Sequence, residues 1–267
     1  MEKVKILGAL AGDIIGSVYE FQNTWSKEFD LFTPWTKFTD DSVMTLAVAK
    51  WLMEDNTHSR SHLIRCMQIL GRQYPRAGYG ESFGFWLRQE DPQPYNSWGN
   101  GAGMRVSPVG LYAKTLDETL QLAELTASVS HNHPEGIKGA QAVAASVFLC
   151  KEGKRKIEIK DYVERTFGYD LNRHIDDIRP HYGFDVSCQG SVPEAIIAFL
   201  EGSSFEEVIR LAISLGGDSD TIACMAGAIA ACRYEIPQEI AKNCYTLLTE
   251  YLRTINNNFI QLLENKR

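Results

Sequence analysis

Two short stretches of the chain collect oxygen-bearing side chains in a pattern that suits the binding of a hard metal cation. Residues 216–221 (GGDSDT) place two carboxylates and two hydroxyls behind a flexible glycine pair, and residues 38–42 (FTDDS) offer the same chemistry far upstream. Carboxylate and hydroxyl oxygens suit Mg²⁺, Mn²⁺ or Ca²⁺, whereas zinc prefers nitrogen and sulfur. The alternative is that these acids only cap helices near their positive dipole ends.

Each acidic stretch is followed by a helical run that has almost no polar face. Residues 42–53 are apolar almost all round, and residues 221–232 are small and apolar. Such patterns predict buried helices at the centre of a domain. The acids therefore lie at the mouths of two core helices, where they can face one another and share cations.

A third helix is predicted over residues 6–21, with glycine at every fourth position. Gly8, Gly12 and Gly16 recur one helical turn apart, so they form a smooth stripe that lets another helix approach closely. Asp13 and Glu20 fall on a separate stripe, together with Ser17, because steps of three and four residues return to nearly the same face. That stripe is either solvated or a wall of the site, and we expect the wall.

The remaining pattern is helical with irregular connections. Further helices are predicted over residues 59–73, 117–129, 134–150, 191–201, 204–215 and, as two helices, 237–264, while 22–37, 74–110, 151–160 and 169–190 are predicted to be loops or turns. Residues 156–159 (KIEI) are the only short strand candidate. We therefore expect an all-α fold, with residues 1–267 forming one compact multi-helix domain.

The composition excludes several classes of protein. With 267 residues, 44% hydrophobic and 23% charged, the chain can bury a sizeable core. A formal net charge of −7 argues against a dedicated nucleic-acid-binding surface. The six cysteines show no CxxC or Cys/His zinc spacing. No targeting signal and no apolar run of about 18 residues is evident, so we expect a cytoplasmic protein without membrane association. We also expect a monomer.

Two weaker motifs lie between the acidic stretches. Residues 97–105 (SWGNGAGMR) combine unobstructed backbone N–H groups with an aromatic ring and a cation, the parts needed to hold a nucleotide diphosphate. A turn-rich linker is the alternative, because no established phosphate-binding spacing is present. Residues 130–133 (SHNH) lack the further ligands of a zinc site, which favours ligand contact or a structural role for His131. Asp176 and Asp177 are expected to be solvated.

Four motifs in order resemble the ADP-ribosylglycohydrolase family. They are GALAGD at 8–13 with GSVYE at 16–20, FTDDS at 38–42, NGAGMRVSP at 100–108 and GGDSDT at 216–221. The resemblance covers residues 8 to about 230 and implies an all-α fold that binds two Mg²⁺ or Mn²⁺ ions. The metal ligands that it implies are Thr39, Asp40, Asp41, Asp218, Asp220 and Thr221.

The same resemblance implies a substrate and a reaction. The chain is expected to release ADP-ribose from ADP-ribosylated substrates by hydrolysing the N- or O-glycosidic bond at the distal ribose. Glu20 is the expected general acid or base, and Asp41 is the other candidate for polarising the attacking water. The residues expected to bind ADP-ribose are Ser97, Gly99, Asn100, Gly101 and Arg105 at the diphosphate, Trp98 on the adenine, and His131 as a further contact.

The acceptor of the ADP-ribose stays open at this point. Residues 76–82 (RAGYGES) look more like the branch of the family that acts on O-linked ADP-ribose, on serine or in polymers, than like the arginine-specific branch. The arginine-specific branch has an additional acid, for which Glu81 is the candidate substitute. Protein, polymer and nucleic acid are all conceivable acceptors. The rival functions are a dimetal phosphohydrolase acting on nucleotides, a non-catalytic ADP-ribose-binding protein, and a metal-stabilised helical scaffold.

Overall fold

The structure is a computed structural model that describes residues 5–266. All the regular secondary structure in these residues is helical. Within those residues the only strand-like pairing is an isolated bridge between Gly99 and Ser187. The expected all-α single domain is therefore confirmed. The helices are α1 (Leu7–Gly16), α2 (Asp40–Glu54), α3 (Arg60–Gln73), α4 (Glu81–Trp86), α5 (Gly101–Met104), α6 (Ser107–Tyr112), α7 (Leu116–Ser128), α8 (Pro134–Lys151), α9 (Lys156–Phe167), α10 (Ile175–Ile178), the 3₁₀ turn η1 (Arg179–His181), α11 (Cys188–Glu201), α12 (Phe205–Ile213), α13 (Ser219–Ala230), α14 (Gln238–Leu247) and α15 (Glu250–Asn265).

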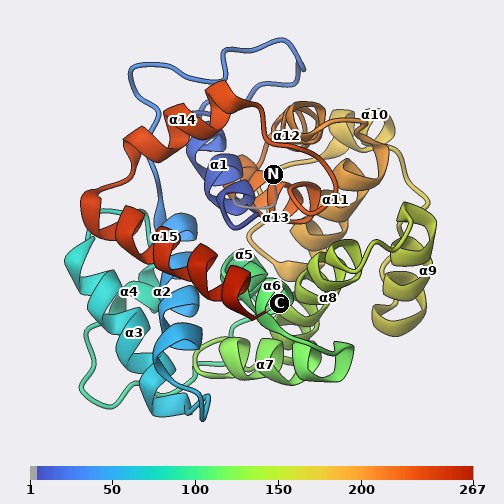
Figure 1. Ribbon diagram of the computed structural model, residues 1–267. Helices are drawn as coiled ribbons and strands as arrows, with labels where there is room; N and C mark the ends of the chain where they lie inside the picture. The colour runs from blue at the N-terminus through green and yellow to red at the C-terminus, as the bar shows by residue number, and fades with distance from the viewer. Residues whose placement is uncertain (1–4, 267) are drawn as a thin grey trace.

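The glycine stripe of α1 packs directly on α13, near the middle of the molecule (Figure 1). A Cβ atom on Gly12 would lie 2.6 Å from the backbone nitrogen of Cys224, and one on Gly16 would lie 2.9 Å from that of Asp220. Gly8 faces the backbone of Gly227 in the same way. The two backbones approach each other closely only because side chains are absent along this line, as the sequence predicted.

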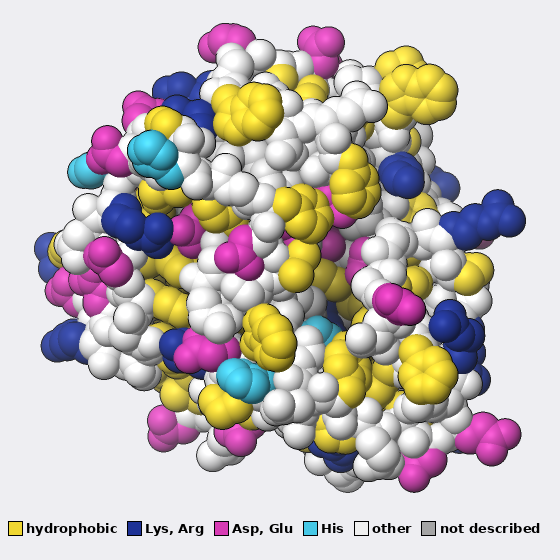
Figure 2. Space-filling model, turned by 180° about the vertical axis from the view of Figure 1, so that it is seen from behind, with side chains coloured by type: hydrophobic (Ala, Val, Ile, Leu, Met, Phe, Trp, Pro, Cys, Tyr) yellow, Lys and Arg dark blue, Asp and Glu magenta, His cyan; other side chains and the backbone are white. Residues whose placement is uncertain are grey.

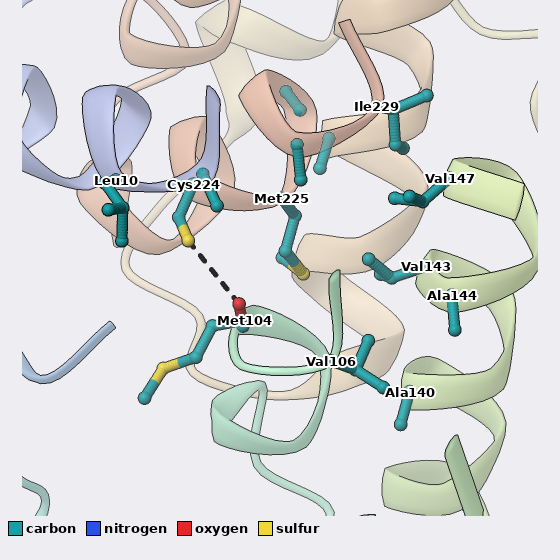
Figure 3. Close-up of a cluster of buried hydrophobic side chains, with 14 of the residues drawn as sticks. Leu10, Met104, Val106, Ala140, Val143, Ala144, Val147, Cys224, Met225 and Ile229 are labelled. Carbon is teal, nitrogen blue, oxygen red and sulfur yellow. Dashed lines mark hydrogen bonds between the residues drawn. The ribbon is translucent and has the colours of Figure 1, made fainter. Parts of the chain in front are cut away.

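The core continues from α13 to the short helix α5 and the long helix α8. Figure 3 shows Met225 of α13 between Met104 of α5 and the row of Val143 and Val147 on α8. In the same view the Cys224 thiol donates a hydrogen bond to the Met104 carbonyl oxygen (3.5 Å). This packing fixes the glycine-rich segment before α5 relative to the beginning of α13.

The outer helices enclose this core. In Figure 1, α14 and α15 cross the face on which α1 and α2 lie. Helix α14 packs against α1, and α15 packs against α2. Of the helices within residues 5–266, not one combines the length and the apolar character that crossing a lipid bilayer requires. The monomeric state and cytoplasmic location expected from the sequence stay predictions.

Several helix boundaries follow from local capping. Thr39, Ser59 and Ser204 each precede a helix, and their hydroxyl oxygens accept hydrogen bonds from backbone N–H groups of its first turn. At the beginning of α12 only one half of a capping box forms: the Ser204 hydroxyl oxygen accepts a hydrogen bond from the Glu207 N–H (3.1 Å). The Glu207 carboxylate accepts instead from the N–H of Ser203 (2.7 Å).

Four predictions about local structure are wrong. Residues 156–159 begin helix α9 and form no strand, because Ile159 is buried while Ile157 is 51% exposed, and the next buried positions, Val163 and Phe167, follow at helical spacing. The charged turn predicted over residues 151–160 is therefore shorter. The segment 74–110 is not one long loop, since it contains α4, α5 and part of α6. Helix α1 ends at Gly16 and not near residue 21.

Candidate active site

The two acidic stretches lie together, at the first turns of α2 and α13. Ligand oxygens of Asp13, Asp41 and Asp220 lie within 4.8 Å of one another, and so do those of Glu20, Asp218 and Asp220. Asp220 belongs to both groups. Each group of three acids could hold a cation, and the shared carboxylate places the two groups side by side.

Asp13 belongs to this cluster although the sequence pattern pointed only to a wall of the site. Its side chain is fully buried, and one oxygen accepts hydrogen bonds from the N–H groups of Thr39 and Ser42 (3.0 Å each) and from the Ser42 hydroxyl. The other oxygen accepts from the Thr39 hydroxyl (2.5 Å). Asp13 therefore fastens α1 to the beginning of α2. The polar stripe with Ser17 and Glu20 was the sequence signal for it.

Asp41 has an unused oxygen in the centre of the cluster. Its Oδ2 accepts a hydrogen bond from the hydroxyl of Thr221 (3.2 Å). Its Oδ1 is buried and has no hydrogen-bond partner among residues 5–266. Because a buried carboxylate oxygen without a partner costs free energy, this atom fits the role of a ligand to a cation. The donor set consists of oxygens alone, which suits Mg²⁺ or Mn²⁺.

The electrostatics of the cluster also fit a cation. Burial, followed by repulsion from neighbouring carboxylates, raises the pKa of Asp41 and of Asp220 well above the ordinary range. The same causes raise the pKa of Asp40 to about 8 and that of Glu20 to about 7. So many acids cannot all be ionised in a buried site without a compensating positive charge.

The interpretation of these acids as simple helix caps fails for α13. Asp218 occupies the N-cap position, but its side chain makes no capping hydrogen bond. Its Oδ2 accepts instead from the side-chain amide of Asn100 (2.7 Å). Gly216 and Gly217 have φ values of +74° and +66°, a left-handed conformation that glycine adopts readily. This turn directs Asp218 towards the cluster.

The acids form one end of a cavity of about 690 Å³. Figure 2, which shows the face opposite to that of Figure 1, has a hollow with acidic side chains beside it and large hydrophobic side chains around it. All the predicted binding residues line the cavity, as do Glu20 and every predicted metal ligand but Thr39, which is turned towards Asp13. The lining residues that had been predicted are Glu20, Asp40, Asp41, Ser97, Trp98, Gly99, Asn100, Gly101, Arg105, His131, Asp218, Asp220 and Thr221.

Beneath the glycine-rich segment, three side chains form a buried chain of hydrogen bonds. The Arg105 guanidinium donates to the Ser130 hydroxyl oxygen (2.8 Å), and that hydroxyl lies 2.8 Å from Nδ1 of His131. The Ser130 hydroxyl accepts from Arg105, and its own hydrogen finds an acceptor at Nδ1 only in the tautomer that carries the His131 proton on Nε2, which favours that tautomer. Burial and the Arg105 charge lower the pKa of His131. His131 is therefore neutral and carries its proton on Nε2.

That Nε2–H group faces the glycine-rich segment. A Cβ atom on Gly101 would lie 3.1 Å from Nε2, and one on Gly99 would lie 3.5 Å away. Arg105 is fully buried, and its burial lowers the pKa of the guanidinium to about 10. Two of its nitrogens, Nε and Nη1, have no acceptor among the described residues. The segment predicted to hold a diphosphate thus has a buried positive charge and a neutral donor behind it.

Some residues of the cavity were missed by the sequence analysis. Phe184 and Val186 belong to a segment predicted only to be irregular, yet they line the cavity, and Phe184 stacks on Phe21 with 6.0 Å between ring centroids. The preceding acids Asp176 and Asp177 are exposed, as expected. Nothing in the local pattern distinguishes Phe184 from other loop aromatics. Glu81, suggested as a substitute acid, lies at the cavity and is exposed.

Comparison with known proteins gives a consistent assignment. Mouse ADP-ribosylhydrolase ARH3 is 26% identical over 319 aligned positions, which cover 90% of this chain and 86% of the mouse protein. ADP-ribosylarginine hydrolase Tri1 of Pseudomonas putida (strain GB-1) is 23% identical, and the alignment covers 88% of this chain and 70% of the Tri1 chain. A solved structure described as an ADP-ribosylglycohydrolase-related protein complex superposes with a TM-score of 0.72 at 22% identity, covering 98% of this chain and 97% of that chain.

The match to the family as a whole is wider than any single motif. The sequence profile described as ADP-ribosylglycohydrolase matches residues 5–267. All four motifs that suggested the resemblance lie within this range, and each of them supplies residues that line the cavity. This chain belongs to the ADP-ribosylglycohydrolase family.

Proposed function

We propose that this protein is a metal-dependent hydrolase that releases ADP-ribose from ADP-ribosylated substrates by cleaving the glycosidic bond at the distal ribose. The observation that carries the proposal is that two groups of acidic residues share Asp220 and line a cavity together with the glycine-rich segment. Family membership supports ADP-ribose hydrolysis. The shared carboxylate supports the dependence on two metal ions.

Two Mg²⁺ or Mn²⁺ ions would be held by the acids of the cluster. Asp13, Asp41 and Asp220 form one set of donors, and Asp218 and Asp220, which lie beside Glu20, form the other. Bound ions supply charge stabilisation and orient the ribose and a water molecule. Thr39 contributes by holding Asp13 in place, and the side-chain amide of Asn100 orients Asp218.

The other end of the cavity suits the ADP moiety. His131 offers a neutral Nε2–H donor next to Gly101, and the buried charge of Arg105 favours an anion near this segment. Trp98 is 52% exposed and lines the cavity, so its ring is accessible for stacking on a base. A diphosphate lying along residues 97–101 would place the distal ribose towards the acids.

Glu20 is the best placed group for proton transfer. It lies in the turn that follows α1, is less buried than Asp41, and lines the cavity. Burial and the nearby Asp218 raise its pKa to about 7, which suits a general acid or base at neutral pH. Asp41 accepts a hydrogen bond from the Thr221 hydroxyl and lies in the centre of the cluster, so the role of a metal ligand fits it better.

Glu20→Gln is expected to slow turnover by about 10²- to 10⁴-fold while ADP-ribose binding is retained within a few-fold. The amide keeps the shape of the side chain but cannot transfer a proton. Single-turnover rates and ADP-ribose calorimetry measure the two effects. Glu28→Gln, which changes an exposed acid outside the cavity, is the matched control and should retain most of the rate. Loss of binding in Glu20→Gln would make Glu20 a structural or metal-holding residue instead.

One panel of substrates tests the proposed activity and identifies the acceptor. Proteins ADP-ribosylated on arginine or on serine, poly(ADP-ribose) and ADP-ribosylated nucleic acid are incubated with chelator-treated protein, with and without Mg²⁺ or Mn²⁺. Metal-dependent release of free ADP-ribose from at least one substrate is the expected result. Release of phosphate from nucleotides instead would identify a phosphohydrolase. Binding of ADP-ribose without turnover of any substrate would identify a binding protein.

A further inference from the structure

A second group of metal-ligating side chains lies where α2 ends and α3 begins. It consists of Glu54, the last residue of α2, with His62 and Cys66 on α3. One ligand atom from each lies within 4.8 Å of the other two. None of the three lines the active-site cavity. The group therefore belongs to a separate part of the surface.

The two oxygens of Glu54 have separate partners. Oε1 is bonded by the Lys50 ammonium, one helical turn earlier on α2. Oε2 lies 3.2 Å from Nε2 of His62 and 3.9 Å from Sγ of Cys66. These separations are close to those between neighbouring ligands of a tetrahedral ion with bonds of about 2.0–2.3 Å. Lys50 acts on the outer oxygen and holds the carboxylate in this orientation.

The connection between the two helices keeps the three ligands in register. The Asp55 carboxylate accepts hydrogen bonds from the N–H groups of Thr57 (2.9 Å) and Ser59 (2.7 Å) and from both of their hydroxyls. The Trp51 indole donates to the carbonyl oxygen of Ser59 (3.2 Å). On α3, His62 and Cys66 are four residues apart and face the same way. The ligands are thus positioned by the fold before any ion binds.

We propose that Glu54, His62 and Cys66 form a site for a transition-metal ion of the zinc class, with solvent completing the coordination. The nitrogen, sulfur and oxygen donors match Zn²⁺ and contrast with the oxygen-only cluster of the active site. Glu54 and His62 are partly exposed, which gives an ion access, while Cys66 is buried. The sequence pattern did not indicate this site, because Glu54 lies on α2 while the other two ligands lie on α3.

Binding of the ion requires a proton to leave the thiol. Burial and the adjacent Glu54 carboxylate raise the pKa of Cys66 to about 12, so the thiol is protonated in the metal-free protein. On coordination the sulfur loses this proton to solvent and becomes a thiolate ligand, and the ion's positive charge compensates both negative groups. The bound ion would link the end of α2, whose other end carries Asp41, to α3.

Titration of the chelator-treated full chain with Co²⁺, under a non-thiol reductant and with Mg²⁺ in excess, tests the proposal. Cobalt bound to a thiolate has a charge-transfer band in the near ultraviolet, which the oxygen-only cluster cannot give. We expect this band to appear and saturate at one equivalent, and Zn²⁺ to remove it. Cys66→Ser should abolish the band, and His62→Gln should weaken Co²⁺ binding by about tenfold or more.

Two cysteine variants are the matched controls. Cys224→Ser removes the thiol near Asp41, and Cys232→Ser removes one that is partly exposed; both should keep the band. Absence of the band in the unaltered protein, or its persistence in Cys66→Ser, would overturn the proposal. Should Cys66→Ser fail to fold, the His62→Gln titration decides, because unchanged Co²⁺ affinity in that variant also overturns it.

Discussion

Asp220→Asn is expected to abolish metal-dependent turnover, lowering the rate by about a thousandfold or more. Asp220 belongs to both groups of acids that could hold a metal ion, so its loss should weaken cation binding at both. Charge stabilisation by a bound ion is worth several kcal/mol, and each factor of ten in rate corresponds to about 1.4 kcal/mol. Single-turnover assays at saturating Mg²⁺ measure the effect.

The same substitution is expected to stabilise the metal-free protein. Burial and the neighbouring Asp41 raise the pKa of Asp220 in the folded state, so the ionised form costs stability, and this cost grows as the pH rises from the unfolded pKa to the folded one. The neutral amide removes that cost. Chelator-treated Asp220→Asn should therefore melt at a higher temperature than the unaltered protein, with a larger difference at pH 8 than at pH 5. The Mg²⁺-induced rise in melting temperature should be smaller.

Asp177→Asn is the matched control for this prediction. Asp177 is an exposed acid on α10, so its neutralisation should change neither turnover nor the response to Mg²⁺. Full activity in Asp220→Asn would remove Asp220 from the metal centre. A lower melting temperature of the chelated variant at pH 8 would show that mutual repulsion of the acids is not what limits the stability of the metal-free site.

Gly12→Ala is expected to destabilise the protein by about 3 kcal/mol or more. The added methyl group would collide with the Ala223 carbonyl oxygen and lie 2.6 Å from the nitrogen of Cys224. Both are backbone atoms of a buried helix, so neither can move aside as a flexible side chain would. Separation of α1 from α13 would also displace Asp13 from Asp220, and metal-dependent activity should fall together with stability.

Urea denaturation followed by circular dichroism measures this loss. Gly84→Ala is the control, because Gly84 lies within α4 and the nearest atom to an added methyl group would be 3.8 Å away. That variant should be unchanged or gain up to about 1 kcal/mol from reduced backbone freedom. If Gly12→Ala is as stable as the unaltered chain, the close approach of α1 and α13 is not required for the fold.

The sequence by itself determined the helical class, the central helices and the two acidic stretches. The reason is that helix periodicity, capping residues and glycine spacing act over a few residues. The stripe of Gly8, Gly12 and Gly16 predicted a close helix contact, and the apolar runs after residues 42 and 221 predicted buried helices. Local patterns also misled, as at residues 156–159, where Ile157 and Ile159 suggest alternation and α9 exposes one of them.

Tertiary structure alone decided which residues meet. Asp13 bonds Thr39 across 26 positions, and Thr221 bonds Asp41 across 180. No spacing rule reaches that far, because such contacts depend on how whole helices pack. The same packing brings Phe184 to the cavity and Glu54 to Cys66. The chain therefore specifies its chemical groups locally, while the approach of α1, α2 and α13 converts them into one centre with a shared carboxylate.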